Sequence, residues 1–211
     1  MNVPSGMKTF GLTGGVGMGK SAAADILRGF SVPVVDTDDI ARRLVQSGEP
    51  ALAEIQTTFG NEIVDADGRL RRGELARIIF ADPAAREKLE AILHPRIRTA
   101  WLAQVDSWRK NNPPLVVVVI PLLFETRAES LFDKTICVAC SAASQQQRLQ
   151  ARGWDAEHIQ QRLAAQWPVA VKIARADFVV WTEGSVEVHR QQWQQILKKS
   201  NYQVRTSVAL R

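Results

Sequence analysis

The stretch GLTGGVGMGKSA (residues 11–22) directly follows a short apolar run and precedes a segment rich in helix-forming residues. A strand, a glycine-rich loop and a helix in that order are the setting in which the pattern G-x-x-x-x-G-K-[ST] binds phosphate. The pattern is filled by Gly14, Gly19, Lys20 and Ser21. Glycines let backbone N–H groups converge on phosphate oxygens, and the start of the helix adds a positive dipole. We therefore expect Lys20 to reach a transferred phosphoryl group and Ser21 to ligate Mg²⁺.

Beyond this loop, short apolar runs alternate with helical segments, which predicts an α/β fold with a doubly wound, mostly parallel sheet. Five strands are expected: KTFGLTG (8–14), SVPVVDTDD (31–39), PLVVVVI (114–120), DKTICVAC (133–140) and ADFVVW (176–181). The four consecutive valines of 114–120 leave no polar face, so we expect this strand to be the central one, buried on both sides.

Residues 50–112 have a helical pattern and contain no expected strand of the main sheet. Breaks are expected at the turn DADGRLRRG (65–73), at Asp82-Pro83 and at His94-Pro95, since proline removes a helical hydrogen bond. The region is therefore predicted to be a helical insertion with a binding surface of its own.

The net charge of +5 and the pI of about 9.6 would suit a nucleic-acid-binding protein. The basic residues are interleaved with acidic ones on helical segments, however, which is typical of solvated faces, and a small phosphorylated substrate would suit the remaining charge equally well. No apolar run approaches the roughly 20 residues that cross a bilayer, and the N-terminal residues do not resemble a secretory signal. We expect a cytoplasmic protein that binds neither nucleic acid nor membrane.

The two cysteines form a C-x-x-C pattern, Cys137 to Cys140, inside a β-branched run. A redox pair would be activated at the start of a helix, and a zinc site would need more ligands than three scattered histidines provide. Buried thiols on a strand are the predicted state.

Two carboxylates, Asp36 and Asp38, close the second expected strand and should project toward the phosphate site. In phosphoryl transfer, one carboxylate orients or deprotonates the attacking hydroxyl and another helps to hold the metal. Alternatively, one or both cap the next helix, because Asp is a favoured N-cap residue. Asp39 is expected in the first turn of that helix, where it complements the dipole.

In IPLLFE (120–125), Pro121 should turn the chain at the carboxyl edge of the sheet, and Glu125 is either a site carboxylate or the start of a helix. No aspartate ends the valine-rich strand, so we expect the metal ligands to be Ser21 and the pair Asp36 and Asp38 at the end of the second strand.

Arg148 and Arg152 have i,i+4 spacing and should share a helix face. Two guanidinium groups there suit a lid over transferring phosphates, and a solvated face is the alternative.

The segments GLTGGVGMGKS, VVDTDDIAR, LHPRIR, IPLLFE, RLQARG, RLAAQ and ADFVV…GS, from Gly11 to about Lys199, resemble the blocks of the dephospho-coenzyme A kinases in the same order. The resemblance implies a P-loop kinase that phosphorylates the ribose 3′-hydroxyl of dephospho-coenzyme A with ATP, the last step of coenzyme A synthesis. It also implies three parts: a nucleotide-binding core (7–40, 113–142 and 176–200), a helical coenzyme-A-binding subdomain (41–112) and a helical lid (143–175). Independently of the resemblance, residues 201–211 are expected to form a flexible tail.

The resemblance further implies roles for individual residues. The ATP phosphates would be held by Gly15, Val16, Gly17, Met18, Gly19, Lys20, Ser21 and Ala22, with Arg152 contributing from the lid. Catalysis would involve Asp38 as the base, together with Asp36, Lys20 and Arg148, and Mg²⁺ would be held by Ser21 and Asp36. The acceptor would be bound by His94, Pro95, Leu122 and Glu125, and Gln166 and Lys172 lie in the segment that leads back to the fifth strand. The chain departs from the family at Thr182, where an asparagine is general, at Met18, where a small residue is usual, and at Ala22, where a second hydroxyl is common.

Two other readings remain open on the residues. A different small-molecule P-loop kinase, acting on a nucleoside or nucleotide, would share the loop, the lid arginines and the fold. An ATP-binding regulatory or nucleic-acid-binding module would use the positive charge instead. The Asp-x-Asp pattern and the helical insertion with its LHP segment favour a dephospho-coenzyme A kinase over both alternatives. We expect a monomer or a weak homo-oligomer.

Overall fold

The computed structural model describes residues 6–200 and 202. Most of the predicted tail, 201–211, lies outside the described residues; Tyr202 is buried, and its hydroxyl donates to the Phe30 carbonyl at 3.2 Å. The chain divides into two compact units, one comprising residues up to Asp36 and from Trp108 onward, the other Thr37–Ser107. No helix in the described part of the chain is long and apolar enough to cross a membrane.

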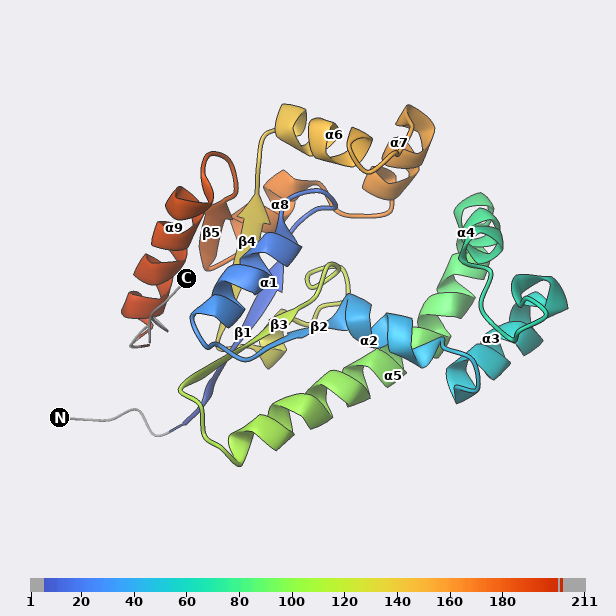
Figure 1. The fold of residues 1–211 in the computed structure, drawn as a ribbon, viewed down its shortest axis with the longest axis horizontal. Coiled ribbons are helices and arrows are strands. Elements are labelled where there is room, and N and C mark those ends of the chain that lie inside the picture. The colour runs from blue at the N-terminus through green and yellow to red at the C-terminus, as the bar shows by residue number, and fades with distance from the viewer. Residues whose placement is uncertain (1–5, 201, 203–211) are drawn as a thin grey trace. The chain divides into compact units, whose positions relative to one another are not determined.

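The first unit is built on a five-stranded parallel sheet in the order β2-β3-β1-β4-β5 (Figure 1). Its strands are β1 (Lys8–Thr13), β2 (Val34–Asp36), β3 (Leu115–Val119), β4 (Lys134–Ala139) and β5 (Phe178–Trp181). The expected strand number and parallel pairing are confirmed. The expectation that the valine-rich strand is central is wrong: β1 occupies that position. β3 lies between β1 and β2 and is fully buried, so its apolar run marks an interior strand without specifying which one.

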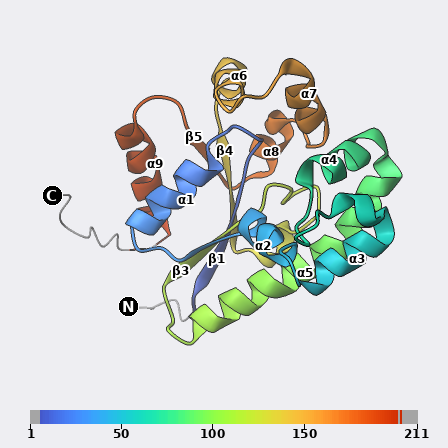
Figure 2. The same cartoon turned by 45° about the vertical axis from the view of Figure 1, so that its right-hand side comes forward.

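Both faces of this sheet are covered, as a doubly wound fold requires (Figure 2). On one face lie α1 (Lys20–Gly29) and α9 (Val186–Lys199), which pack Leu27 and Trp193 against strand residues such as Leu12. The other face is covered by the segment that follows β3. A Cβ at Gly11 would lie 2.5 Å from Leu123 and 2.8 Å from Phe132, so the strand has room only for glycine there.

Three further helices and one 3₁₀ helix complete the described part of this unit: η2 (Glu129–Leu131), α6 (Ala142–Gln150), α7 (Ala156–Ala164) and α8 (Val169–Arg175). Ser141 caps α6 by accepting from the Ser144 N–H, and Asp155 caps α7 by accepting from the His158 N–H. In each case a short side-chain oxygen satisfies a donor that the helix itself cannot.

The second unit contains α2 (Thr37–Leu44), α3 (Pro50–Phe59), η1 (Asn61–Ile63), α4 (Arg72–Ala81) and α5 (Pro83–Arg109), whose last residues belong to the first unit. Its core includes Ile55, Ile63 and Leu89. A helical region without a strand of the main sheet is confirmed. The break expected at His94-Pro95 is wrong, since α5 runs through Pro95. One proline removes a single backbone donor, and the flanking turns carry the buried residues Ile92 and Trp101, whose burial supports the helix on both sides.

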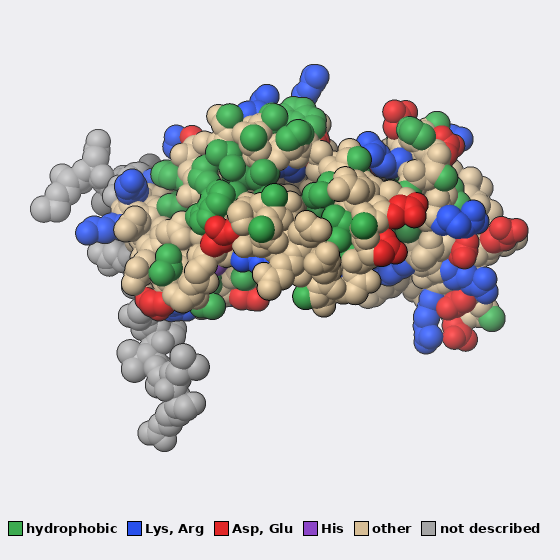
Figure 3. Space-filling view, turned by 90° about the horizontal axis from the view of Figure 1, so that it is seen from above, with side chains coloured by type: hydrophobic (Ala, Val, Ile, Leu, Met, Phe, Trp, Pro, Cys, Tyr) green, Lys and Arg blue, Asp and Glu red, His purple; other side chains and the backbone are tan. Residues whose placement is uncertain are grey.

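Hydrophobic side chains gather on part of the surface seen in Figure 3. In the described part of the first unit, the large exposed apolar side chains are Trp167, Val171, Val179, Trp181, Val186 and Val188. The edge strand β5 is nevertheless closed at its end by Gln192, whose side-chain amide accepts from the Trp181 N–H and donates to the Trp181 carbonyl, both at 2.8 Å. A side chain in this position occupies the backbone groups that another strand would use.

Candidate active site

The glycine-rich loop connects the central strand β1 to α1, at the carboxyl edge of the sheet. Gly19, the N-cap of α1, has φ of +91°, and a Cβ there would lie 3.1 Å from Thr182. A larger residue would therefore be both strained and crowded. The first turn of α1 contains no acidic residue, and no side chain caps it, so its dipole and N–H groups suit an anionic ligand.

Lys20 is the first residue of α1, and its ammonium group lies against the start of the loop. It donates to the Gly14 carbonyl at 2.8 Å and to the Gly15 carbonyl at 3.1 Å. Ser21 and Ala22 follow in the first turn, and both are exposed. The cation and the hydroxyl of the predicted phosphate site are thus both carried by the first turn of α1.

The side chain of Met18 points into the protein and not toward the loop's binding side. It is 2% exposed and packs with Ala139 and Cys140, against which Val169 and Ile173 of α8 also lie. The departure from a small residue is accommodated because this position contributes its backbone to the loop and its side chain to the core.

Thr182 forms hydrogen bonds with the glycine-rich loop, α6 and the end of β4. From the sequence, the threonine at this position indicated only that the side-chain amide of an asparagine is missing. Its hydroxyl donates to the Met18 carbonyl at 3.0 Å and accepts from Arg148 Nη1 at 2.9 Å. Arg148 Nη2 also donates to the Thr182 carbonyl at 2.6 Å. The Thr182 N–H donates to Ala139 at the end of β4. Arg148 is therefore held beside the loop through Thr182, a contact that the sequence did not indicate.

The expectation that Arg148 and Arg152 share a helix face is wrong. α6 ends at Gln150, and Arg152 lies in the following turn, where its side chain is exposed. The i,i+4 spacing is meaningful only while the helix continues, and this helix stops before a glycine with φ of +79° at position 153.

Two glutamines bind the backbone of Val16 within the loop. The Val16 N–H donates to Gln166 Oε1 at 3.0 Å, and Gln145 Nε2 donates to the Val16 carbonyl at 2.7 Å. Sequence reasoning gave Gln166 no role and did not single out Gln145. A glutamine in a helical segment has no local signal that reveals a partner about 130–150 residues away.

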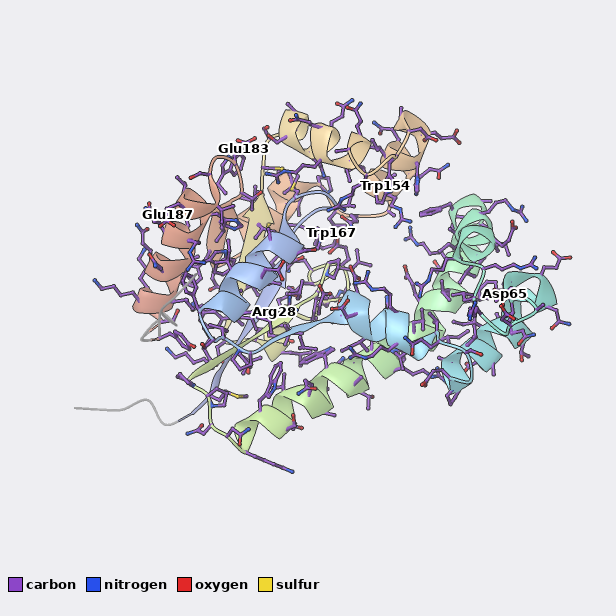
Figure 4. The ribbon with its side chains drawn as sticks, viewed as in Figure 1. Arg28, Asp65, Trp154, Trp167, Glu183 and Glu187 are labelled. Carbon is purple, nitrogen blue, oxygen red and sulfur yellow. The ribbon has the colours of Figure 1, made fainter. Side chains whose placement is uncertain are left out.

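Glu125 forms a buried ion pair with Lys172 of α8. Lys172 Nζ is 2.7 Å from Glu125 Oε1 and donates to the Pro121 carbonyl at 2.8 Å. Glu125 Oε1 also accepts from the Trp167 N–H at 2.9 Å (Trp167 is labelled in Figure 4). Of the two alternatives for Glu125, a helix start is excluded, because residues 121–127 form consecutive turns.

Asp36 is the last residue of β2, pairs in register with Val119 and is half-buried. Asp38 was expected to close the same strand, and this is wrong. It lies in the first turn of α2, where it is exposed. Asp39 occupies the same turn, as predicted, and accepts from Arg42. Asp38 belongs to the second unit, as do His94 and Pro95, which lie within α5.

The ionisable groups discussed next have shifted pKa values because of burial or hydrogen bonds within the fold. Burial raises the pKa of Cys137 to about 11 and also raises the pKa of Cys140, so both thiols stay protonated at neutral pH, as predicted for buried strand cysteines. Cys140 does precede the N-cap of α6, contrary to expectation, and burial keeps it inert there. Glu183 (Figure 4) has its pKa lowered to about 2 by hydrogen bonds from the Ser141 and Ser144 hydroxyls and from Trp181.

A parallel sheet in this strand order, with a phosphate-binding loop after the central strand and a lysine over that loop, defines a P-loop kinase. The particular family follows from sequence: the profile of the dephospho-CoA kinases matches residues 8–187, and the chain belongs to that family.

Three known proteins illustrate what the chain is similar to. A protein named dephospho-CoA kinase from Anaeromyxobacter dehalogenans is 45% identical over 182 residues, 86% of each chain. The solved structure of TT1252 from Thermus thermophilus has a TM-score of 0.79 at 34% identity and covers 92% of this chain and 98% of its own. Dephospho-CoA kinase from Campylobacter jejuni has a TM-score of 0.66 at 25% identity and covers 90% of this chain and 96% of its own.

Proposed function

We propose that this protein transfers the terminal phosphoryl group of ATP to the ribose 3′-hydroxyl of dephospho-coenzyme A and so forms coenzyme A. The observation that carries the proposal is the family match over residues 8–187, combined with the uncapped helix start behind Lys20. A nucleoside triphosphate suits this loop, because the uncapped start of α1 supplies backbone donors and a helix dipole and Lys20 places its ammonium group against the loop.

The loop residues 15–22 hold the phosphates of ATP, with Lys20 stabilising the charge on the group in transfer and Arg152 assisting from the proposed lid, 143–175. Among the described residues, no group of three or more His, Cys, Asp or Glu side chains could hold a metal. Mg²⁺ keeps several waters and binds through few protein ligands plus phosphate oxygens, so a hydroxyl and one carboxylate would be enough to hold it. Ser21 and Asp36 are the proposed protein ligands, and bound Mg²⁺ would neutralise charge on the phosphates.

Asp38 is the proposed general base: its carboxylate is exposed in the first turn of α2 and would accept the proton of the acceptor hydroxyl. The proposed coenzyme-A-binding part is the helical region 41–112, in which His94 and Pro95 shape the acceptor site; Leu122 and Glu125 are the acceptor contacts proposed for the core. Arg148 acts from beside the loop, where Thr182 holds it. We further propose a cytoplasmic monomer or weak homo-oligomer that does not bind nucleic acid.

An acceptor panel tests the reaction. The purified protein is incubated with ATP and Mg²⁺ and with either dephospho-coenzyme A or nucleoside monophosphates, and ADP release is followed. We expect ADP release only with dephospho-coenzyme A. Turnover with a nucleoside monophosphate and none with dephospho-coenzyme A would refute the proposal in favour of another P-loop kinase. Tight, strongly salt-dependent binding to polynucleotide without turnover would favour a nucleic-acid-binding module instead.

The role of Asp38 is tested by Asp38→Asn, with Asp39→Asn in the same turn as the matched control. We expect Asp38→Asn to lower kcat by about 10²–10⁴-fold, the usual contribution of a general base, while ATP binding is unchanged. Asp39 already has a partner in Arg42, and its variant should keep nearly full turnover. Equal activity of the two variants would exclude Asp38 as the base.

A further inference from the structure

The backbone N–H and C=O of Val16 are each bound by a side-chain amide from a segment that follows β4. Gln145 of α6, which is 8% exposed, donates to its carbonyl, and Gln166, which follows α7, accepts from its N–H at 3.0 Å. Loops of this type bind phosphate through their backbone N–H groups. A side chain that takes one of these donors therefore stands at the ligand-binding surface itself.

The orientation of the Gln166 carboxamide follows from its partner. A backbone N–H can only donate, so the Gln166 atom that contacts the Val16 N–H must be the carboxamide oxygen. The NH₂ group of the carboxamide therefore points away from the Val16 N–H. Within the described part of the chain, this NH₂ group has no hydrogen-bond partner. Gln166 thus presents two donors beside the loop.

The backbone that carries Gln166 is anchored to the core. The next residue, Trp167, donates its N–H to Glu125, and Glu125 is paired with the fully buried Lys172. Lys172 also donates to the Pro121 carbonyl, which accepts from the Thr13 hydroxyl at the end of β1. A side chain on so constrained a segment is held in place before any ligand arrives, which lowers the entropy cost of binding.

The position of Lys20 indicates which phosphate lies nearest. Its ammonium group contacts the Gly14 and Gly15 carbonyls, directly before Val16. The lysine of such a loop reaches the β- and γ-phosphates, whereas the helix start lies farther along the loop. Val16 and the Gln166 amide therefore lie at the γ-phosphate end of the site.

We propose that Gln166 recognises the γ-phosphate: its Oε1 remains on the Val16 N–H while its Nε2 donates to an oxygen of the terminal phosphoryl group. This inference rests on the proposed function, because it requires ATP in the loop. Gln166 thereby distinguishes the nucleoside triphosphate from the diphosphate and helps to orient the group that is transferred.

Binding measurements on the full chain test this role. Calorimetric titration with Mg²⁺ and either a β,γ-imido analogue of ATP or ADP compares the wild type with Gln166→Ala and Gln166→Glu. Gln161→Ala is the matched control, because Gln161 lies on α7, is exposed and bonds only to Glu157 through its amide. We expect Gln166→Ala to weaken binding of the ATP analogue about 10-fold to 100-fold, the range for one hydrogen bond to a charged group, with ADP affinity changed less than about twofold.

Gln166→Glu sharpens the test. Its carboxylate still accepts from the Val16 N–H, but it has no donor for phosphate and places a negative charge there, so the loss for the ATP analogue should exceed that of Gln166→Ala. In turnover, Gln166→Ala should raise the KM for ATP and lower kcat. Equal losses for ATP analogue and ADP would overturn the proposal by indicating a purely structural contact, and so would unchanged affinity for both. A wild type that binds neither nucleotide would instead refute the proposed function.

Discussion

Replacing Lys172 by methionine tests how the segment after α7 is attached to the sheet. The side chain of Lys172 is fully buried, and that of Glu125 is 14% exposed, so both charges are largely removed from water. In the Lys172→Met variant, Glu125 Oε1 would still accept a hydrogen bond from the Trp167 N–H. Glu125 Oε2 is already buried without a hydrogen-bond partner in the described structure. Removing one partner from a buried ion pair leaves an uncompensated charge, which costs about 3–5 kcal/mol. We expect Lys172→Met to lower the free energy of unfolding by this amount.

Urea denaturation followed by circular dichroism measures the loss, and a double-mutant cycle assigns it to the pair. Glu125→Gln leaves the buried Lys172 charge uncompensated and should also destabilise the protein, although its amide keeps an oxygen that can accept from Lys172 and Trp167. The double variant, with neither charge, should be more stable than the sum of the two losses predicts by about 1–3 kcal/mol. Arg28→Met is the control (Arg28 is labelled in Figure 4). The side chains of the Arg28–Asp25 pair are 45% and 73% exposed, so the pair should contribute at most about 1 kcal/mol. A loss below about 1 kcal/mol for Lys172→Met, or strict additivity, would refute the reasoning.

Two further substitutions probe the surroundings of the loop. Glu183 has a pKa of about 2 in place of its ordinary 4.5, so its contribution to stability is complete above about pH 4.5 and is lost as the pH falls toward 2. Glu183→Gln should flatten the acid-side dependence of the unfolding free energy, and parallel pH profiles for variant and wild type would contradict this. Gly19→Ala should destabilise the protein by about 1–2 kcal/mol, because φ is +91° and the new Cβ would lie 3.1 Å from Thr182. It should also weaken ATP binding, whereas Gly73→Ala, where a Cβ meets nothing within 4 Å, should do neither; equal melting temperatures and ATP affinities for the two variants would count against the role of Gly19.

Much of the architecture could be predicted from local sequence. The alternation of apolar runs with helical segments predicted the five parallel strands, and the glycine-rich loop was recognised because its glycines, Lys20 and Ser21 are close neighbours in the chain. The cap at Asp155 and the buried thiols were also predictable, since each depends on a few adjacent residues. Strand order was harder: the valine-rich run of β3 shows that both its faces are covered, yet β1 and not β3 is central.

Tertiary structure alone decided the partners that surround the loop. Arg148 bonds to Thr182, 34 residues away, and Gln166 bonds to Val16, 150 residues away. Lys172 meets Glu125 and Pro121 only because α8 returns to the carboxyl edge of the sheet. The sequence by itself determined that a phosphate site follows β1, because the chemistry of that loop is local. Which side chains hold the loop depends on long-range packing, since arginine, glutamine and lysine form such bonds with whatever backbone the fold brings to them.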